Sequence, residues 1–212
     1  MESYELETKN GVVKIENKDF SEPTKYLNRD IAKKNLLDIK HVMDKSGVKF
    51  GLIYGTLLGA YREKNFIKHD YDTDLFVLEE VKQDLLDSLP ALINIGFVVC
   101  RYDGLLLSVS RYDEYIDFYF FRKSNFLFRK NSVGLSAKSK YLENTVDYNF
   151  LGQSFQIPQN VESFLTDLYG STWSIPIEND VSMNHHWYIK VRGFIQNNIP
   201  SIFPILSFIK RI

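Results

Sequence analysis

The chain has 212 residues, of which 44% are hydrophobic and 25% are charged, which suits one globular domain with a substantial core. Its 26 basic and 27 acidic residues leave a net charge of −1, which argues against a nucleic-acid-binding protein with a broad basic surface. The single cysteine, Cys100, excludes an internal disulfide and a zinc site built on several cysteines. Because it lies in an apolar run, we expect its side chain to be buried.

The N-terminus has no basic stretch followed by an apolar one, as a secretory signal requires, and no apolar run reaches the roughly 20 residues that span a bilayer. We therefore expect a cytoplasmic protein. The tail over 197–212 is apolar and has a basic end. It is expected to pack on the body of the protein, or alternatively to make peripheral contact with the inner face of the cell membrane.

Local patterns predict the first elements. Polar and apolar residues alternate on both sides of Asn10-Gly11, which predicts a hairpin, a small N-terminal ornament within residues 1–20. Apolar residues then recur every three or four positions over 28–46, which predicts a helix that Gly47 ends.

The rest of the chain alternates between predicted strands and helices. In chain order we expect a strand over 48–54, a short helix over 55–64, a strand over 73–78, a helix over 79–94 bent near Pro90, strands over 97–102, 105–111, 115–121 and 126–129, a hairpin around 150–157, and helices over 160–170 and 181–196. This order suits an α+β fold with an α/β-like core, in which helices cover mainly one face of a sheet. A single domain over 1–212 is expected.

Two carboxylates mark the beginning of the strand over 73–78. Side chains alternate between the faces of a strand, so Asp72 and Asp74 should point the same way. Two such carboxylates can hold a divalent cation, and two cations about 3.5–4 Å apart can clamp a phosphate that undergoes in-line displacement. The pattern therefore suggests phosphoryl or nucleotidyl transfer.

A third acidic candidate, Asp117, lies among apolar and aromatic residues in the strand over 115–121. A charge in such a strand is costly unless it is paired or bound to a metal. A salt bridge to Arg111 or Arg62 is the structural alternative. Because the Asp-x-Asp pair is also present, we favour metal binding or activation of an attacking hydroxyl.

Three residues near the short helix over 55–64 could bind phosphate. Gly55 and Thr56 open the helix, where free backbone N–H groups attract phosphate oxygens, and Arg62 offers a two-pronged donor. A Gly-Thr pair by itself is more often an ordinary turn. Asp70 has two interpretations, since it can orient either a metal ligand or a basic residue.

Three separated motifs together resemble the LicD/fukutin-related family, which has the nucleotidyltransferase fold. The first reads Gly-Thr-Leu-Leu-Gly-Ala-x-Arg over 55–62 and continues as Phe-Ile-x-x-Asp-x-Asp-x-Asp over 66–74. The second is the aromatic strand that contains Asp117. The third, over 155–173, contains Pro-x-Asn and Tyr-Gly. The resemblance spans about residues 36–173, and three motifs in order are far more specific than any one of them.

The resemblance implies a mixed sheet flanked by helices, and a transferase that acts on phosphate-linked groups. Phosphocholine, glycerol phosphate and ribitol phosphate are the expected kinds of group. The donor would be CDP-linked, and the acceptor would be a sugar hydroxyl of a cell-surface glycan or of its lipid-linked precursor, such as those of capsule, lipopolysaccharide or teichoic acid.

The resemblance also implies roles for particular residues. The residues that carry the catalysis and hold Mg²⁺ or Mn²⁺ would be Asp72, Asp74 and Asp117. The residues that bind the donor phosphates would be Gly55, Thr56 and Arg62.

Two other interpretations use the same residues. A nucleotidyltransferase would move a nucleotide from a nucleoside triphosphate to a small molecule or a protein, but the Pro-x-Asn and Tyr-Gly segment favours transfer of a phosphate-linked group. A catalytically inactive binding module would keep only the fold, and the intact set of three aspartates argues against it.

Overall fold

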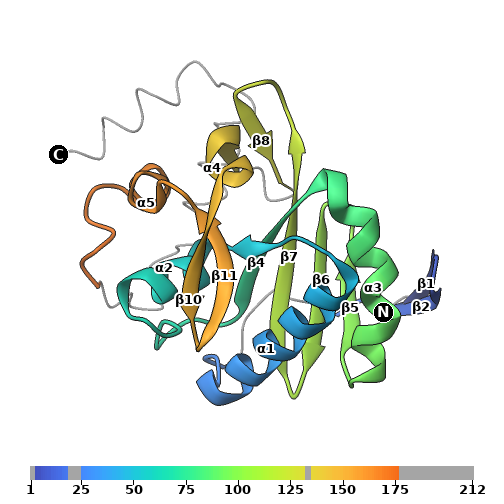
Figure 1. Ribbon diagram of the computed structural model, residues 1–212. Coiled ribbons are helices and arrows are strands. Elements are labelled where there is room, and N and C mark those ends of the chain that lie inside the picture. Colours follow the sequence, from blue (N-terminus) through green and yellow to red (C-terminus); the bar gives the residue numbers. More distant parts are fainter. Residues whose placement is uncertain (1–2, 19–24, 132–134, 177–212) are drawn as a thin grey trace.

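The computed structural model describes residues 3–18, 25–131 and 135–176 (Figure 1). The helix predicted over 181–196 and the apolar tail over 197–212 lie outside these residues. Within the described chain, no helix combines the length and the apolar character that crossing a bilayer requires.

Eleven strands in the described residues form one sheet, and their order across it is β1-β2-β5-β6-β7-β4-β3-β11-β10, with β8 and β9 attached to β7. The sheet is mixed, since β2 with β5, β4 with β7 and β3 with β11 are parallel pairs, while the others are antiparallel. In chain order the strands are β1 (Ser3–Thr8), β2 (Gly11–Glu16), β3 (Gly51–Leu52), β4 (Thr73–Leu78), β5 (Val98–Tyr102), β6 (Leu106–Arg111), β7 (Glu114–Lys123), β8 (Phe128–Lys130), β9 (Ser136–Lys138), β10 (Thr145–Phe150) and β11 (Gln153–Pro158).

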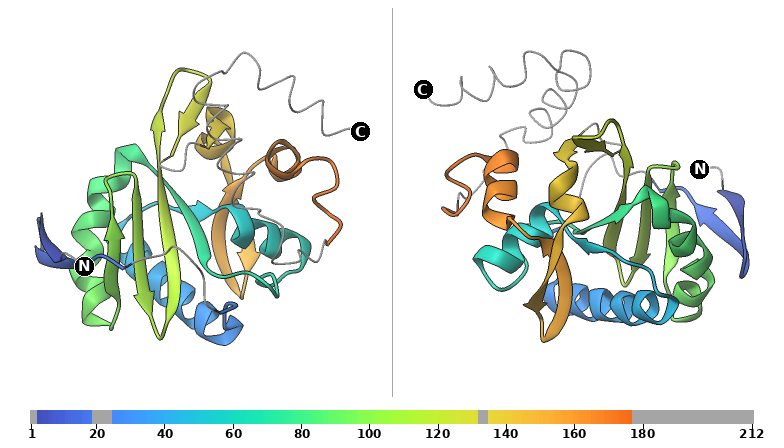
Figure 2. Two further views of the ribbon diagram at one scale, coloured as in Figure 1. Left: turned by 180° about the vertical axis from the view of Figure 1, so that it is seen from behind. Right: turned by 45° about the horizontal axis from the view of Figure 1, so that its top comes forward.

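The helices of the described chain cover the two faces of the sheet unequally. In chain order they are α1 (Arg29–Ser46), α2 (Tyr54–Arg62), the 3-10 turn η1 (Glu79–Val81), α3 (Lys82–Asn94), α4 (Ser139–Glu143) and α5 (Val161–Tyr169). Helices α1 and α3 lie together on one face of the sheet (Figure 1). Seen from behind, β5, β6 and β7 carry no helix of the described chain on their other face (Figure 2). The predicted α+β architecture is confirmed.

Helix α1 shows how local sequence sets its own boundaries. The Asn28 side chain accepts hydrogen bonds from the backbone N–H groups of Asp30 and Ile31, which caps the first turn. Gly47 ends the helix at φ 72°, a left-handed conformation that glycine adopts without strain. The apolar stripe faces the sheet, and its buried members are Ala32, Leu36, Ile39, Val42 and Met43.

The predicted N-terminal hairpin forms and is joined to the main sheet. Strand β2 pairs with β5, and Val13 and Ile15 are fully buried in the core. The turn is held against α3, because the Lys9 N–H and the Asn10 side-chain amide both donate hydrogen bonds to Asp87. The hairpin therefore contributes to the edge of the core as well as to the sheet.

The strand predicted over 48–54 is much shorter than expected. Only the two residues of β3 pair with their neighbours, and α2 already begins at Tyr54. At Gly51 the chain passes so close to β4 that a Cβ would overlap the Phe76 ring. The strand over 73–78 forms with the predicted bounds, and α3 runs through Pro90 to Asn94.

Cys100 is fully buried in β5, as its apolar neighbours predict. Its thiol lies 3.3 Å from the Ser108 carbonyl oxygen, and burial raises the pKa of the thiol to about 11. The reactive thiolate form of Cys100 is therefore scarce as well as inaccessible.

Reaction with a thiol reagent tests the burial of Cys100. At pH 8 we expect the folded protein to react at least about 100-fold more slowly than the denatured protein. Equal rates with and without denaturant would contradict this burial.

Candidate active site

The parallel register of β4 and β7 brings two predicted aspartates together. Asp74 on β4 lies opposite Asp117 on β7. Across β7, Asp117 lies opposite Ser108 on β6, which in turn lies opposite Arg101 on β5. Because residues opposite each other in a sheet project from the same face, these four side chains form one row across four strands.

The row lies on one face of the sheet, and the face of β5, β6 and β7 away from α1 and α3 carries no helix of the described chain (Figure 2). Side chains alternate along β7, so the neighbours Ile116 and Phe118 point to the other face, where both are buried in the core. Asp74 and Asp117 are themselves only 6% and 5% exposed. The fold therefore places two carboxylates in a largely desolvated site.

The beginning of α2 is bound to Asp74 by three hydrogen bonds. The Gly55 N–H donates to Asp74 Oδ2 at 3.1 Å, and the Asp74 N–H donates to Thr56 Oγ1 at 2.8 Å. The Ile53 N–H donates to the Asp74 carbonyl oxygen at 3.2 Å. In these contacts Gly55 and Thr56 position Asp74, and their role in binding donor phosphates stays a prediction.

Asp70 lies against the same turn. Its Oδ1 accepts a hydrogen bond from the Tyr71 N–H at 3.1 Å, while its Oδ2 is buried without a hydrogen-bond partner. A Cβ on Gly55 would overlap this carboxylate, so glycine is what permits the close approach. Burial, reinforced by the charge of Glu63, raises the pKa of Asp70 to about 6.

Four carboxylates form what we call the acidic centre: Asp70, Asp72, Asp74 and Asp117. Burial raises the pKa of Asp72 and Asp74 well above the ordinary range and also raises that of Asp117. Repulsion adds to this effect, since the charges of Asp70 and Asp117 raise the pKa of both Asp72 and Asp74. Like charges at low dielectric resist full ionisation, and a bound cation relieves that repulsion.

Arg101 provides a positive charge beside the acidic centre. Its Nη2 lies 2.9 Å from Asp117 Oδ2, and its Nε donates to Ser108 Oγ at 2.9 Å. The sequence suggested Arg111 or Arg62 as the ion-pair partner of Asp117, but the strand register selects Arg101 instead. That register joins residues far apart in the chain, which local patterns do not reveal.

Arg62 acts on Tyr169 together with Asp70 and Asp74, but its guanidinium is already occupied by contacts with other groups of the chain. Its Nη2 contacts Glu63 Oε1 at 2.6 Å, and its Nη1 donates to the Trp173 carbonyl oxygen at 3.1 Å. Burial raises the pKa of Tyr169 well above its usual value, Asp74 and Asp70 raise it further, and Arg62 lowers it. Binding of donor phosphate by Arg62 stays a prediction.

Two tyrosines that the sequence analysis missed, one half-buried (Tyr54) and one buried (Tyr119), complete the site. Their rings, on Tyr54 and Tyr119, meet edge to face with centroids 5.0 Å apart. The Tyr54 hydroxyl accepts a hydrogen bond from the Asn131 amide at 2.5 Å. Burial, followed by the charge of Asp74, raises the pKa of both phenols well above their usual value. Both therefore remain neutral and can donate hydrogen bonds.

The acidic centre has the chemistry of a divalent-cation site, although its ligands are not drawn together. Across the described ranges, no three His, Cys, Asp or Glu side chains already form a metal-binding cluster. Carboxylate oxygens are what Mg²⁺ prefers, and Asp70 Oδ2 and Asp117 Oδ1 are buried without hydrogen-bond partners. The residues therefore fit a divalent cation, with side-chain rearrangement needed to close around it.

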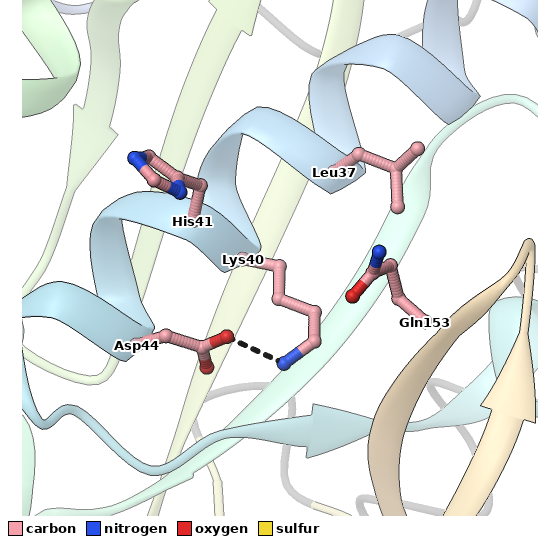
Figure 3. Close-up of a pocket in the computed structure, with 5 residues that line it drawn as sticks. All are labelled: Leu37, Lys40, His41, Asp44 and Gln153. Atoms are coloured by element: carbon pink, nitrogen blue, oxygen red, sulfur yellow. Dashed lines mark hydrogen bonds and ion pairs between the residues drawn. The ribbon is translucent and has the colours of Figure 1, made fainter.

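A shallow pocket of about 160 Å³ lies elsewhere, between α1 and the start of β11 (Figure 3). It contains an ion pair between Lys40 and Asp44, 2.7 Å apart and one helical turn from each other. No member of the acidic centre lines it, so we do not include it in the candidate site. The lining residues are Leu37, Lys40, His41, Asp44 and Gln153.

Comparison with known proteins identifies a family whose domain model covers the acidic centre. The family model described as LicD/FKTN/FKRP, nucleotidyltransferase domain, matches residues 47–160. Similar proteins include the ribitol-5-phosphate transferase FKTN of Homo sapiens, 29% identical over 162 residues that make up 71% of this chain and 34% of that protein. FKTN of Mus musculus is 30% identical over 144 residues, 62% of this chain and 31% of that protein. The chain thus spans about a third of the length of these relatives.

A solved structure agrees on the fold. The solution structure of the antibiotic-resistance factor ANT(2'')-Ia has a TM-score of 0.51 and covers 87% of this chain and 93% of its own. At 13% sequence identity, this likeness concerns the fold alone.

The hydrogen bond between Thr56 and Asp74 can be tested by substitution. Thr56 is fully buried, so Thr56→Val leaves the Asp74 N–H without its acceptor at nearly unchanged side-chain volume. We expect the free energy of unfolding to fall by about 1–3 kcal/mol. Thr56→Ser keeps the hydroxyl and should recover much of this loss. Urea denaturation measures both, and a Val variant more stable than the Ser variant would contradict the assigned contact.

Proposed function

The chain belongs to the LicD/FKTN/FKRP nucleotidyltransferase domain family, and from that premise we propose that it transfers a phosphate-linked group from a CDP-activated donor to a sugar hydroxyl. The observation that carries the proposal is the acidic centre, in which Asp74 and Asp70 lie against Gly55 at the start of α2 and the charges of Asp70 and Asp117 act on Asp72 and Asp74. All four lie within the segment that the family model matches. The name of the FKTN relatives supports ribitol phosphate as the first group to test.

The proposed reaction is a displacement at phosphorus. The acceptor oxygen forms a bond to the phosphorus of the transferred group, the bond from that phosphorus to the CMP oxygen breaks, and CMP leaves with the electron pair. Asp117 Oδ1 has no hydrogen-bond partner and is an acceptor for the hydroxyl proton. The acceptor molecule would be a cell-surface glycan or its lipid-linked precursor.

Asp72, Asp74 and Asp117 would hold Mg²⁺ or Mn²⁺, which would neutralise charge that develops on the transferred phosphate. The rest of the site positions these ligands. Arg101 orients Asp117, and the turn at Gly55 orients Asp74. Catalysis by this arrangement would depend mainly on positioning and electrostatic stabilisation.

Substitution of single aspartates tests the catalytic assignment. Asp72→Asn, Asp74→Asn and Asp117→Asn each remove a charge at nearly constant shape, so the fold should persist while CMP release falls by about 100-fold or more. The matched control is Asp113→Asn, in the exposed turn before β7, where φ is 60° and Asn is readily accommodated. Near-normal turnover in any of the three site variants would remove that residue from the proposed mechanism.

Calorimetric titration tests the donor class. We expect one of CDP-ribitol, CDP-glycerol and CDP-choline to bind in the presence of Mg²⁺ or Mn²⁺, and to lose that binding when Asp72→Asn is combined with Asp74→Asn. CTP and ATP serve as comparison ligands. Preference for a triphosphate would favour nucleotidyl transfer, and a lack of metal-dependent binding by all five compounds would favour an inactive module.

A further inference from the structure

The hairpin formed by residues 122–130 presents an exposed apolar tip. It joins β7 to β8 and projects beyond the neighbouring strands in each view (Figures 1 and 2). At its tip Phe126 is 88% exposed and Leu127 is 53% exposed. Two adjacent large apolar side chains, exposed to this degree, contribute little to the core and create a surface suited to contact with another body.

The backbone of this tip is fixed by hydrogen bonds. The Asn125 side-chain oxygen accepts from the N–H groups of Leu127 and Phe128, each at 2.9 Å, which forms an Asx turn. The Leu127 carbonyl oxygen accepts from the Ser139 N–H at 2.7 Å, which ties the tip to the start of α4. The exposure of Phe126 is therefore set by a defined turn.

Positive charge flanks the tip on both strands. The hairpin contains four basic residues and no acidic residue. Arg129 is buried and paired with Glu80 and a second glutamate, so it belongs to the fold. Arg122 and Lys123 on one strand are exposed, and Lys130 on the other is half-buried. The Lys123 side chain is 65% exposed and its Nζ lies 3.9 Å from Glu80 Oε1.

We propose that this hairpin docks on the surface of an anionic lipid bilayer. Phe126 and Leu127 enter the headgroup region, while the three surface cations contact anionic headgroups. An apolar tip between cations matches a bilayer that is apolar within and negatively charged at its face. The inference goes beyond the proposed function and does not depend on it.

The position of the hairpin suits an enzyme that works beside a membrane. Asp117 lies six residues before Lys123, the last residue of β7. At roughly 3.3 Å per residue the two are about 20 Å apart along the strand. When the tip rests on a bilayer, the acidic centre therefore stays outside the bilayer, within reach of soluble donors and of extended headgroups.

Site-specific fluorescence tests the contact in the full 212-residue chain. Phe126→Cys is labelled with a polarity-sensitive fluorophore, and the buried Cys100 does not need to be replaced. Val12→Cys is the matched control, because Val12 is an apolar residue of the other hairpin and is 61% exposed. We expect a blue shift at position 126 with vesicles that contain phosphatidylglycerol, no shift with pure phosphatidylcholine, and no shift at position 12.

Three results would overturn the proposal. They are the absence of a shift at position 126, an equal shift at positions 126 and 12, and emission at position 126 that is already blue-shifted without vesicles. The last result would mean that another part of the chain or a second copy covers the tip.

Unlabelled variants provide an independent measurement. Phe126→Ser combined with Leu127→Ser should weaken cosedimentation with phosphatidylglycerol vesicles by about tenfold or more, whereas Val12→Ser should not. Arg122→Gln combined with Lys130→Gln should weaken the preference for anionic vesicles. Unchanged vesicle binding by the double-serine variant would place the membrane contact on another surface and contradict the proposal.

Discussion

The in-register parallel pairing of β4 with β7 is the constraint on which the candidate site depends, because it sets Asp74 beside Asp117. Both strands are mainly apolar where they pair, and alternate residues of β7, among them Ile116 and Phe118, are buried in the core. A slip of one residue would turn a carboxylate into that core and an apolar side chain out of it. The packing of the core and the geometry of the acidic centre are therefore fixed by the same register.

The acidic centre is difficult to explain by stability alone. The charges of their neighbours raise the pKa of Asp72 and Asp74 beyond the effect of burial, while Arg101 supplies an ion pair to Asp117. Desolvated like charges cost free energy, and a fold that needed only stability would do better with neutral side chains at these positions. The hydrogen bonds from the turn at Gly55 hold Asp74 in place against this cost. Negative charge so concentrated, with Asp117 alone paired to Arg101 in the described contacts, is typical of a functional site.

The sequence predicted correctly those elements whose caps, apolar periodicity and turn residues lie within the element itself. Helix α1 has its own cap, apolar stripe and terminal glycine, and the two hairpins around Gly11 and Gly152 have their own turn residues. The apolar segment over 48–54 misled because a buried connection and a buried strand have the same composition. In that segment only Gly51 and Leu52 pair as a strand, and Gly51 lies so close to the Phe76 ring that a Cβ would overlap it.

The candidate site was predictable only where it depends on local sequence patterns. The positions of Asp74 in β4 and of Asp117 in β7 follow from local strand patterns, whereas Asp72 lies in a bend just before β4, where strand alternation does not apply. The pairing of Asp117 with Arg101 requires the register of three strands, and the contact of Asn131 with Tyr54 joins residues 77 positions apart. Burial also changes what a motif residue does, because the Thr56 hydroxyl that resembles a phosphate ligand accepts a backbone N–H.

Strand β7 links the chemistry to the surface contact that we infer. It has ten residues, whereas β4 and β6 have six each, and its last residues pair only with β8. The residues of β7 beyond Phe121 are not needed to bring Asp74 beside Asp117, because that pairing lies nearer the beginning of the strand. Nor does the tip strengthen the core, since Phe126 is almost fully exposed. Arg129 anchors the hairpin to the fold, but an apolar tip that serves neither the core nor the acidic centre, yet is held by a defined turn and flanked by cations, is best explained by a partner outside the chain.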